Sequence, residues 1–183
     1  MPLAAAQNTR AIAISAKQGV AMQIKDIMSQ PIVSVPVDAT LDQAARLMWE
    51  FDCGFVPVID DDGRLAGVVT DRDICMAAYT QGKTLGAIPV GPAMAKAVVA
   101  VHGEELIEQA EHLMRESQIR RLPVLDGEGR PVGVVSMNDL ARLASAAHKS
   151  AINRELVDTL AATCRPRADG RVAETSTVTA VTA

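Results

Sequence analysis

Two copies of one short pattern, GVVTDRD at 67–73 and GVVSMND at 133–139, lie 66 residues apart (133 − 67). In each copy an apolar run leads to a hydroxyl residue, and an aspartate follows three positions later. A hydroxyl residue and an acidic residue at this spacing form a capping box, which satisfies free backbone amides in the first turn of a helix. The pattern therefore predicts, in both places, a strand that passes directly into a helix.

The duplication extends well beyond this pattern. The chain from Asp26 onward realigns with the chain from Pro92 onward at the same shift and without a gap. Under this shift PV at 57–58 meets PV at 123–124, and GR at 63–64 meets GR at 129–130. Self-similarity at one constant shift is the signature of a structural repeat, so the chain contains two copies of one supersecondary unit.

Each copy is predicted to be a β-α-β-β-α unit. Short β-branched runs at 32–35 and 98–101 predict its first strand. The next helix has an apolar stripe, formed by Leu41, Ala44, Ala45, Met48 and Phe51 in one copy and by Leu106, Ile107, Ala110, Leu113 and Met114 in the other. Hairpin turns at 60–63 and 126–129 join strands at 55–59 and 65–69, and at 122–125 and 132–135. The last helix begins at Thr70 or Ser136.

The fold class that follows is α/β, in its α+β form. A three-stranded sheet with two helices is too small to bury a sufficient core alone. We therefore expect the two repeats to pack sheet to sheet with pseudo-twofold symmetry, and a cleft between them would be the natural ligand site.

The chain divides into six predicted segments. Residues 1–22 form a flexible tail, within which Met22 is an alternative start, and 23–82 form the first repeat domain. A Gly- and Pro-containing linker at 83–91 leads to the second repeat domain at 92–148. Apolar spacing predicts an amphipathic helix at 149–164, and the Thr- and Ala-rich end at 165–183 is predicted to be disordered.

Composition excludes several classes of protein. With 18 basic and 22 acidic residues, no basic stripe and 2% aromatic residues, the chain lacks the charge and stacking surfaces of a nucleic-acid binder. No apolar run is long enough to span a membrane, and the first residues do not resemble a signal peptide. The odd number of cysteines, without Cys-x-x-Cys spacing, indicates reduced thiols rather than disulfides or a metal site. We therefore expect a cytoplasmic protein.

The capping-box residues Thr70, Asp73, Ser136 and Asp139 are open to two interpretations. They can simply cap helices, which stabilises a helix by about 1 kcal/mol. The same geometry can also bind a nucleotide, because free amides at a helix start attract phosphate and a carboxylate can accept both hydroxyls of a ribose. The pair Arg120 and Arg121 is likewise either a solvated pair or a fork for phosphate.

The duplicated unit, the Pro-Val before each turn and the form Gly-Val-Val-[Thr/Ser]-x-x-Asp resemble the cystathionine-β-synthase (CBS) domain over residues 25–147. The resemblance implies a regulatory module that binds AMP, ADP, ATP, NAD or S-adenosylmethionine between its repeats. It gives the hydroxyl residues a contact with phosphate or ribose, the aspartates a contact with the ribose diol, and the two arginines a contact with phosphate. The residues that would line the adenine site are Val35, Val56, Val101 and Leu122.

The two predicted sites are not equivalent, because Gly54 and Phe55 occupy the positions of Arg120 and Arg121 in the first copy. No positioned nucleophile and base is evident, so we expect no enzymatic activity, no catalytic cofactor and no metal site. The expected partners are a nucleotide, a second copy of the chain in a homodimer, and an effector protein. The alternative is a ligand-free interaction protein or a thiol redox sensor that uses Cys53 or Cys75.

Overall fold

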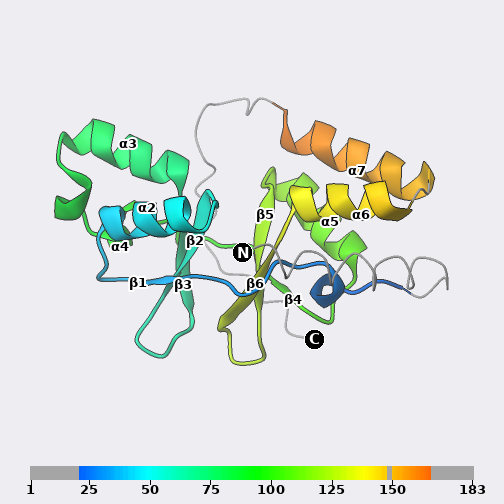
Figure 1. Ribbon diagram of the computed structural model, residues 1–183, viewed down its shortest axis with the longest axis horizontal. Coiled ribbons are helices and arrows are strands. Elements are labelled where there is room, and N and C mark those ends of the chain that lie inside the picture. Colours follow the sequence, from blue (N-terminus) through cyan, green and yellow to red (C-terminus); the bar gives the residue numbers. More distant parts are fainter. Residues whose placement is uncertain (1–20, 148–149, 166–183) are drawn as a thin grey trace. The chain divides into compact units, whose positions relative to one another are not determined.

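The computed structural model describes residues 21–147 and 150–165, which form two compact units (Figure 1). Each unit contains a three-stranded sheet and helices, and this confirms the predicted α+β class with two repeats. The predicted tail at 1–22 lies outside the described residues except for its last two, and the predicted disordered end at 165–183 lies outside them except for Arg165.

The first compact unit, called here the repeat-1 unit, is built on residues 32–98. Its elements are β1 (Val35–Pro36), α2 (Leu41–Glu50), β2 (Phe55–Ile59), β3 (Leu65–Thr70), α3 (Asp71–Gln81), the 3-10 helix η2 (Leu85–Ala87) and α4 (Val90–Ala93). Strand β2 is central, parallel to β1 and antiparallel to β3. The β3 strand passes into α3 without an intervening loop, as its capping box predicts.

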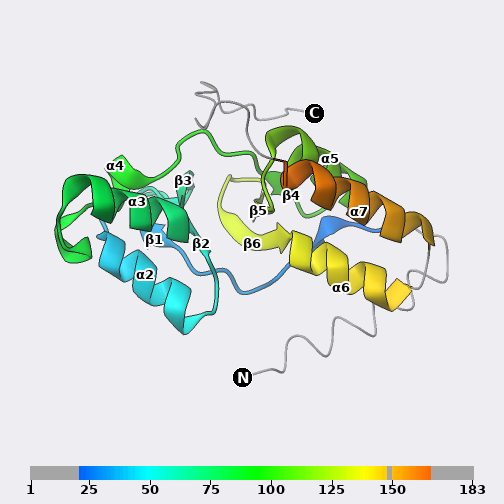
Figure 2. The same cartoon turned by 90° about the horizontal axis from the view of Figure 1, so that it is seen from above.

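The second compact unit, the repeat-2 unit, combines the residues before 32 with most of the chain after Val99. Its elements are the 3-10 helix η1 (Ile24–Asp26), β4 (Val101–His102), α5 (Ile107–Ser117), β5 (Arg121–Leu125), β6 (Pro131–Ser136), α6 (Met137–Ala147) and α7 (Ser150–Thr163). Strand β5 is central and parallel to β4. Helix α7 packs against α5 and α6, and it lies beside them in both views (Figures 1 and 2).

Each unit also takes in the segment with which the other repeat begins in the sequence. Ser29 forms an antiparallel bridge with Val134, and its amide donates to the Val134 carbonyl at 2.8 Å. The same bridge joins Ala95 to Val68 in the repeat-1 unit, with hydrogen bonds of 2.9 and 3.0 Å. Segments that the sequence assigns to one repeat are therefore exchanged, and neither unit is continuous in sequence. The predicted domain boundaries stay a prediction.

The central strands and the helices lie close to their predicted positions, whereas the first strand of each repeat is shorter and later. Strand β1 comprises only Val35–Pro36 because these residues alone face a partner strand, at Val58 and Ile59. Strand β4 pairs in the same way with Val124 and Leu125. The predicted linker at 83–91 contains η2 and the start of α4.

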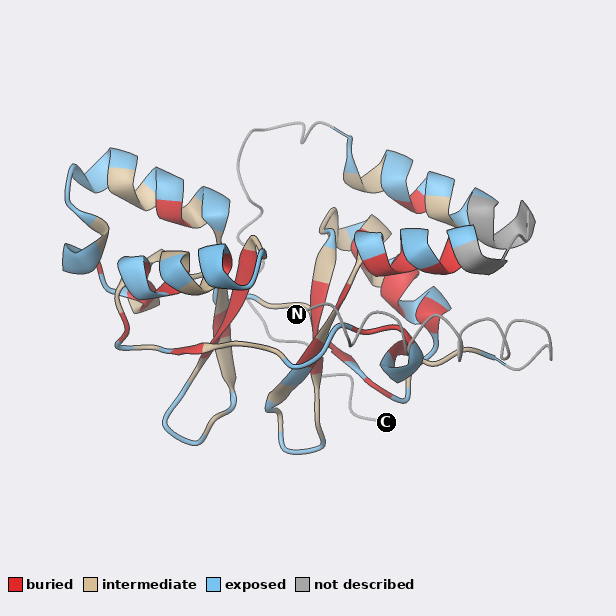
Figure 3. Cartoon of the chain, viewed as in Figure 1, coloured by how far each residue is buried: buried red, intermediate tan, exposed pale blue. Residues whose placement is uncertain are grey.

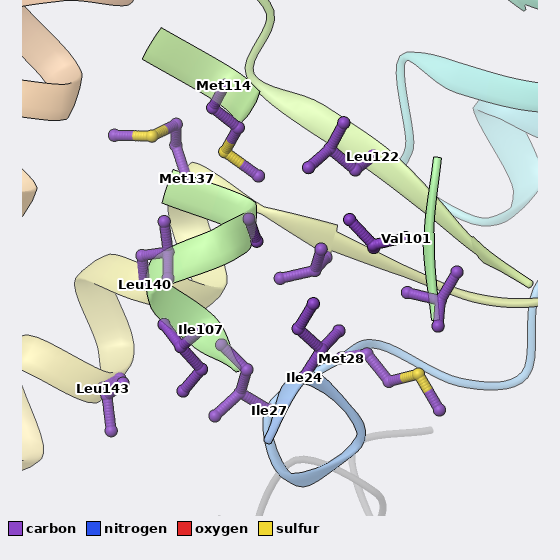
Figure 4. Close-up of a cluster of buried hydrophobic side chains, with 13 residues drawn as sticks. Ile24, Ile27, Met28, Val101, Ile107, Met114, Leu122, Met137, Leu140 and Leu143 are labelled. Carbon is purple, nitrogen blue, oxygen red and sulfur yellow. The ribbon is translucent and has the colours of Figure 1, made fainter. Parts of the chain in front are cut away.

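Buried residues lie on the strands and on the helices of each unit (Figure 3). The repeat-2 core includes Ile24, Val101, Ile107, Met114, Leu122 and Leu140, which converge in Figure 4. The predicted helix stripes are largely buried, with two corrections: Phe51 and Leu106 are exposed. Both residues cap a helix rather than belong to its turns, so their side chains leave the apolar face.

Candidate nucleotide site

The start of α3 holds the first predicted pair, Thr70 and Asp73. Thr70 is the N-cap, and its hydroxyl oxygen accepts a hydrogen bond from the Asp73 amide at 3.3 Å. Oδ2 of Asp73 accepts from the Thr70 amide at 2.9 Å and from its hydroxyl at 2.7 Å. Oδ1 of Asp73 has no hydrogen-bond partner among the described residues. The capping box therefore uses one carboxylate oxygen and leaves the other available.

The start of α6 repeats the capping box with Ser136 and Asp139, but its carboxylate is fully engaged. Oδ2 of Asp139 accepts from the Ser136 amide at 2.7 Å and from its hydroxyl. Oδ1 accepts from the hydroxyl of Ser29 at 3.0 Å and forms an ion pair with Arg142. Asp139 is 2% exposed, whereas Asp73 is half-buried. The two aspartates thus share a position in the repeat and differ in their surroundings.

The arginine pair lies at the same helix start in the repeat-2 unit. The amide of Met137, the first residue of α6, donates to the carbonyl oxygen of Arg120 at 3.0 Å. Arg120 is exposed and Arg121 is half-buried, and neither guanidinium forms an ion pair with a described residue. The backbone of Arg120 therefore lies at the positive end of α6, and a cationic side chain near such a terminus would favour an anion.

The corresponding place in the repeat-1 unit is apolar and acidic. Phe55 pairs with Thr70 across the sheet, so it occupies the strand position beside the start of α3. A Cβ atom on Gly54 would lie 2.8 Å from Oδ2 of Asp71, so a larger residue at position 54 would have to displace that carboxylate. The sequence-based expectation of non-equivalent surroundings is consistent with this difference.

The four residues predicted to wall an adenine lie in the hydrophobic cores. Val35 and Val56 belong to the core of the repeat-1 unit, and Val101 and Leu122 to that of the repeat-2 unit. Each is at most 3% exposed. A contact with adenine stays a prediction, and it would require a ligand to reach side chains that are covered in this structure.

Sequence reasoning missed the two partners of Asp139, Ser29 and Arg142. Ser29 lies 110 residues from Asp139 in the chain, and Arg142 lies outside the capping-box pattern. A signal was nevertheless present, because the shift of 66 pairs Ser29 with Ala95 and Arg142 with Met76. The aspartate is the same in both repeats, whereas these two aligned positions carry different residues. Such a difference beside a shared residue marks a place where the two repeats differ in chemistry.

The remaining candidate groups do not assemble into a catalytic or metal centre within residues 21–147 and 150–165. All three cysteines are free thiols, with Cys53 half-buried and Cys75 and Cys164 exposed. Three or more His, Cys, Asp or Glu side chains arranged to hold a metal ion are not found in this part of the chain. Of the described helices, none has the length and apolar character needed to cross a membrane.

Comparison with known proteins agrees with the duplicated fold and the repeated capping boxes. The family model of the CBS domain matches residues 24–79 and 87–146. The chain belongs to the CBS domain family. Among curated proteins it is similar to the CBS domain-containing protein YhcV of Bacillus subtilis (strain 168), with 37% identity over 118 residues that cover 64% of this chain and 82% of YhcV.

Solved structures of CBS proteins resemble this chain over most of their length. The CBS domain pair of protein MJ0100, in complex with 5′-methylthioadenosine and S-adenosyl-L-methionine, aligns with a TM-score of 0.62 and 27% identity, covering 69% of this chain and 98% of that one. The CBS domain protein PAE2072 from Pyrobaculum aerophilum, complexed with AMP, aligns with a TM-score of 0.62 and 28% identity, covering 74% and 98%. Both of these proteins carry adenosine compounds.

Proposed function

We propose that this chain is a regulatory module that binds an adenosine-type nucleotide and passes the signal to an effector protein without catalysing a reaction. The observation that carries the proposal is the start of α6, where the backbone of Arg120 contacts the first helical residue and where neither Arg120 nor Arg121 forms an ion pair with a described residue. CBS domain pairs are regulatory nucleotide-binding modules, and two similar structures contain AMP or S-adenosyl-L-methionine. AMP, ADP and ATP are the leading candidates, followed by NAD and S-adenosylmethionine.

The ribose and the phosphate of the nucleotide need protein groups of different chemistry. The ribose diol needs a carboxylate that can accept two hydrogen bonds, and Asp73 and Asp139 are the capping-box carboxylates that could supply one. The phosphate needs donors and positive charge, which Arg120, Arg121 and the positive end of α6 could offer. The location of the ligand in a cleft between the repeats stays a prediction, as do the homodimer and the cytoplasmic location.

A thermal-shift panel tests the proposal. A ligand that binds only the folded state at a hundredfold excess over its Kd stabilises the protein by about 2.7 kcal/mol, which corresponds to several degrees in Tm. We expect AMP, ADP or ATP to raise the Tm, and inorganic phosphate at the same ionic strength to raise it far less. If neither these nucleotides nor NAD and S-adenosylmethionine shift the Tm at millimolar concentration, and native mass spectrometry finds no adenosine compound on the purified protein, the proposal is wrong.

A further inference from the structure

Most of the large apolar side chains that the described residues leave exposed belong to two helical surfaces. Four of them lie on or directly after the repeat-1 helices α2 and α3, and they include three of the four aromatic residues of the chain: Trp49, Phe51, Met76 and Tyr79. Trp49 is 88% exposed and Tyr79 is 81% exposed. Met76 and Tyr79 are three residues apart on α3, so they share a face of that helix. We call these four residues the aromatic surface.

The second such surface is the outer face of α7. Val157, Leu160, Ala161 and Cys164 are all exposed. Their spacing of three, four and seven residues places them in one stripe along the helix, called here the α7 stripe. Thr159 is by contrast fully buried, because the opposite face of α7 packs against α5 and α6. Helix α7 therefore covers the repeat-2 helices with one face and exposes apolar side chains on the other.

The internal repeat indicates that the position of Trp49 is suited to contact with a helix. Under the shift of 66, Trp49 aligns with Arg115, whose Nη1 donates to Oγ1 of Thr159 on α7 at 3.0 Å. Ala45, one turn before Trp49, aligns with Glu111, which is 4% exposed. In the repeat-2 unit this side of the helix is therefore covered by α7, whereas Trp49 remains exposed at the same position of the repeat-1 unit.

The chemistry of the two sides indicates which face of a helix each side accepts. Helix α5 holds α7 partly by hydrogen bonds from polar side chains, and the second of them runs from Nε2 of Gln118 to the carbonyl oxygen of Ala162 at 3.5 Å. Trp49 and Asp52 align with the two donors of α5, so the repeat-1 side lacks the guanidinium and the amide. A large indole ring is matched instead by apolar side chains, which the α7 stripe supplies. Tryptophan and tyrosine are also the residues that most often dominate the affinity of protein contacts.

We infer that the α7 stripe of one copy of the chain docks on the aromatic surface of a second copy. The contact joins two different faces, and each chain offers one of each. Its driving force is the removal of exposed apolar side chains from water. Helix α7 lies beyond the residues that match the CBS family model, so the contact uses a segment added to the domain that defines the family. The inference goes beyond the proposed function, since the contact needs no nucleotide.

The fluorescence of Trp49 provides a direct test, because it is the only tryptophan of the chain. As the concentration of the full chain rises, we expect its emission to shift to shorter wavelength and its quenching by acrylamide to fall. Sedimentation velocity should show the mass rising above that of one chain over the same concentration range. Val157→Asp places a charge in the α7 stripe and should abolish all three changes, although it lies on another helix.

Val132→Asp is the matched control for this variant. It introduces the same charge at another exposed valine of the repeat-2 unit, on β6, and should keep the wild-type behaviour. Both substitutions replace exposed side chains, and the Tm of each variant reports whether it is folded.

Mixing two defective variants tests whether the contact joins two different faces. Trp49→Glu retains the α7 stripe but has no tryptophan, whereas Val157→Asp retains Trp49 but has a charged stripe. Each variant alone should associate about tenfold or more weakly than the wild type, as the loss of a dominant side chain from a contact implies. Adding Trp49→Glu to Val157→Asp should restore the shift of the remaining tryptophan, because the intact faces are then on different chains. Adding the double variant Trp49→Glu/Val157→Asp is the control and should leave the emission unchanged.

Three outcomes would overturn the inference. If neither the emission nor the mass of the wild type changes with concentration, a second copy does not dock on the aromatic surface. If the shift persists in folded Val157→Asp alone, the aromatic surface docks a face other than the α7 stripe. If the mixture of the two single variants shows no more shift than the mixture with the double variant, the two faces do not bind each other. None of these measurements contains a nucleotide, so their failure would leave the thermal-shift test of the proposed function unaffected.

Discussion

An ideal Cβ atom on Gly67 would lie 2.8 Å from the carbonyl oxygen of Ala95. Gly67 lies in β3, and Ala95, which lies between α4 and β4 in the chain, forms the bridge to Val68. The absence of a side chain on Gly67 is therefore what lets the two backbones approach closely enough to form the bridge. Gly133 has the same relation to Ser29 in the repeat-2 unit, at the longer distance of 3.2 Å.

Gly67→Ala should lower the free energy of unfolding by about 1 to 3 kcal/mol, the usual cost of overpacking. The added methyl group would meet backbone that is fixed by two hydrogen bonds, so the contact cannot be relieved by a rotamer change. Gly133→Ala should cost less. The control is Gly127→Ala, where a Cβ atom meets nothing within 4 Å and the backbone φ is not positive. Urea unfolding of the three variants measures the free energy of unfolding of each. Equal losses of this free energy in Gly67→Ala and Gly127→Ala would contradict the prediction.

Glu111 predicts a pH dependence of stability. It is 4% exposed, and burial, followed by repulsion from Glu155 on α7, raises its pKa from 4.5 to about 7. Arg115 on the same helix lowers the pKa, and Glu108 raises it further. The folded state holds the Glu111 proton more tightly than the unfolded state does. The protonated carboxyl group therefore contributes its full stabilisation of the folded state below about pH 4.5, and this contribution is lost as the pH rises through about 7.

Glu111→Gln should remove this dependence, because an amide does not ionise. Its free energy of unfolding should exceed that of the wild type at pH 8 by on the order of 1 to 3 kcal/mol, and the two should converge toward pH 4.5. Glu104→Gln, at an exposed position whose charge is not among the causes of the raised Glu111 pKa, is the control and should follow the wild-type curve. Urea midpoints measured across this pH range decide the matter, and parallel curves for Glu111→Gln and wild type would contradict the assignment.

The parts of the fold that the sequence predicts are those whose causes are local. The helix starts at Thr70 and Ser136 follow from capping boxes that involve residues three positions apart, and both boxes are present. The β2 strand follows from a short apolar run next to a turn-forming sequence. Interactions between residues a few positions apart can be predicted because both partners belong to one short sequence pattern.

The parts that could not be predicted depend on partners far away in the chain. The engagement of Asp139 by Ser29 and the burial of Glu111 beneath α7 involve residues dozens of positions apart. Periodicity identified the α7 helix but not the surface it covers, which is fixed in part by the hydrogen bond from Nη1 of Arg115 to Oγ1 of Thr159 at 3.0 Å. The sequence therefore identified the candidate carboxylates but not which of them is free.

Arg142→Met should destabilise the protein, independently of any ligand. The substitution removes the counter-ion of a carboxylate that is almost fully buried, and the side chain that replaces it is the one at the equivalent position of the first repeat. Because the Arg142 side chain is itself largely exposed, we expect a moderate loss of about 1 to 2 kcal/mol. Arg46→Met removes an ion pair between two solvent-accessible side chains, Arg46 and Glu50, and should cost at most about 0.5 kcal/mol. Chemical denaturation of both variants distinguishes the two environments, and losses of equal size would mean that Asp139 does not depend on Arg142.

Arg121→Ala should weaken phosphorylated nucleotides selectively if the start of α6 binds their phosphate. Arg121 is half-buried, lacks an ion pair with any described residue, and lies in the strand beside that helix terminus. A hydrogen bond between charged groups contributes about 1.5 to 3 kcal/mol, so the affinity for AMP should fall about tenfold to a hundredfold. Adenosine has no phosphate, and its affinity should change much less.

Phe55→Ala, at the equivalent position of the repeat-1 unit, is the control for this prediction. It removes no charge, so it should not discriminate between the two ligands. Calorimetric titration with AMP and adenosine measures the difference directly. Equal losses for both ligands in Arg121→Ala would assign the arginine a structural role and move the phosphate contact elsewhere.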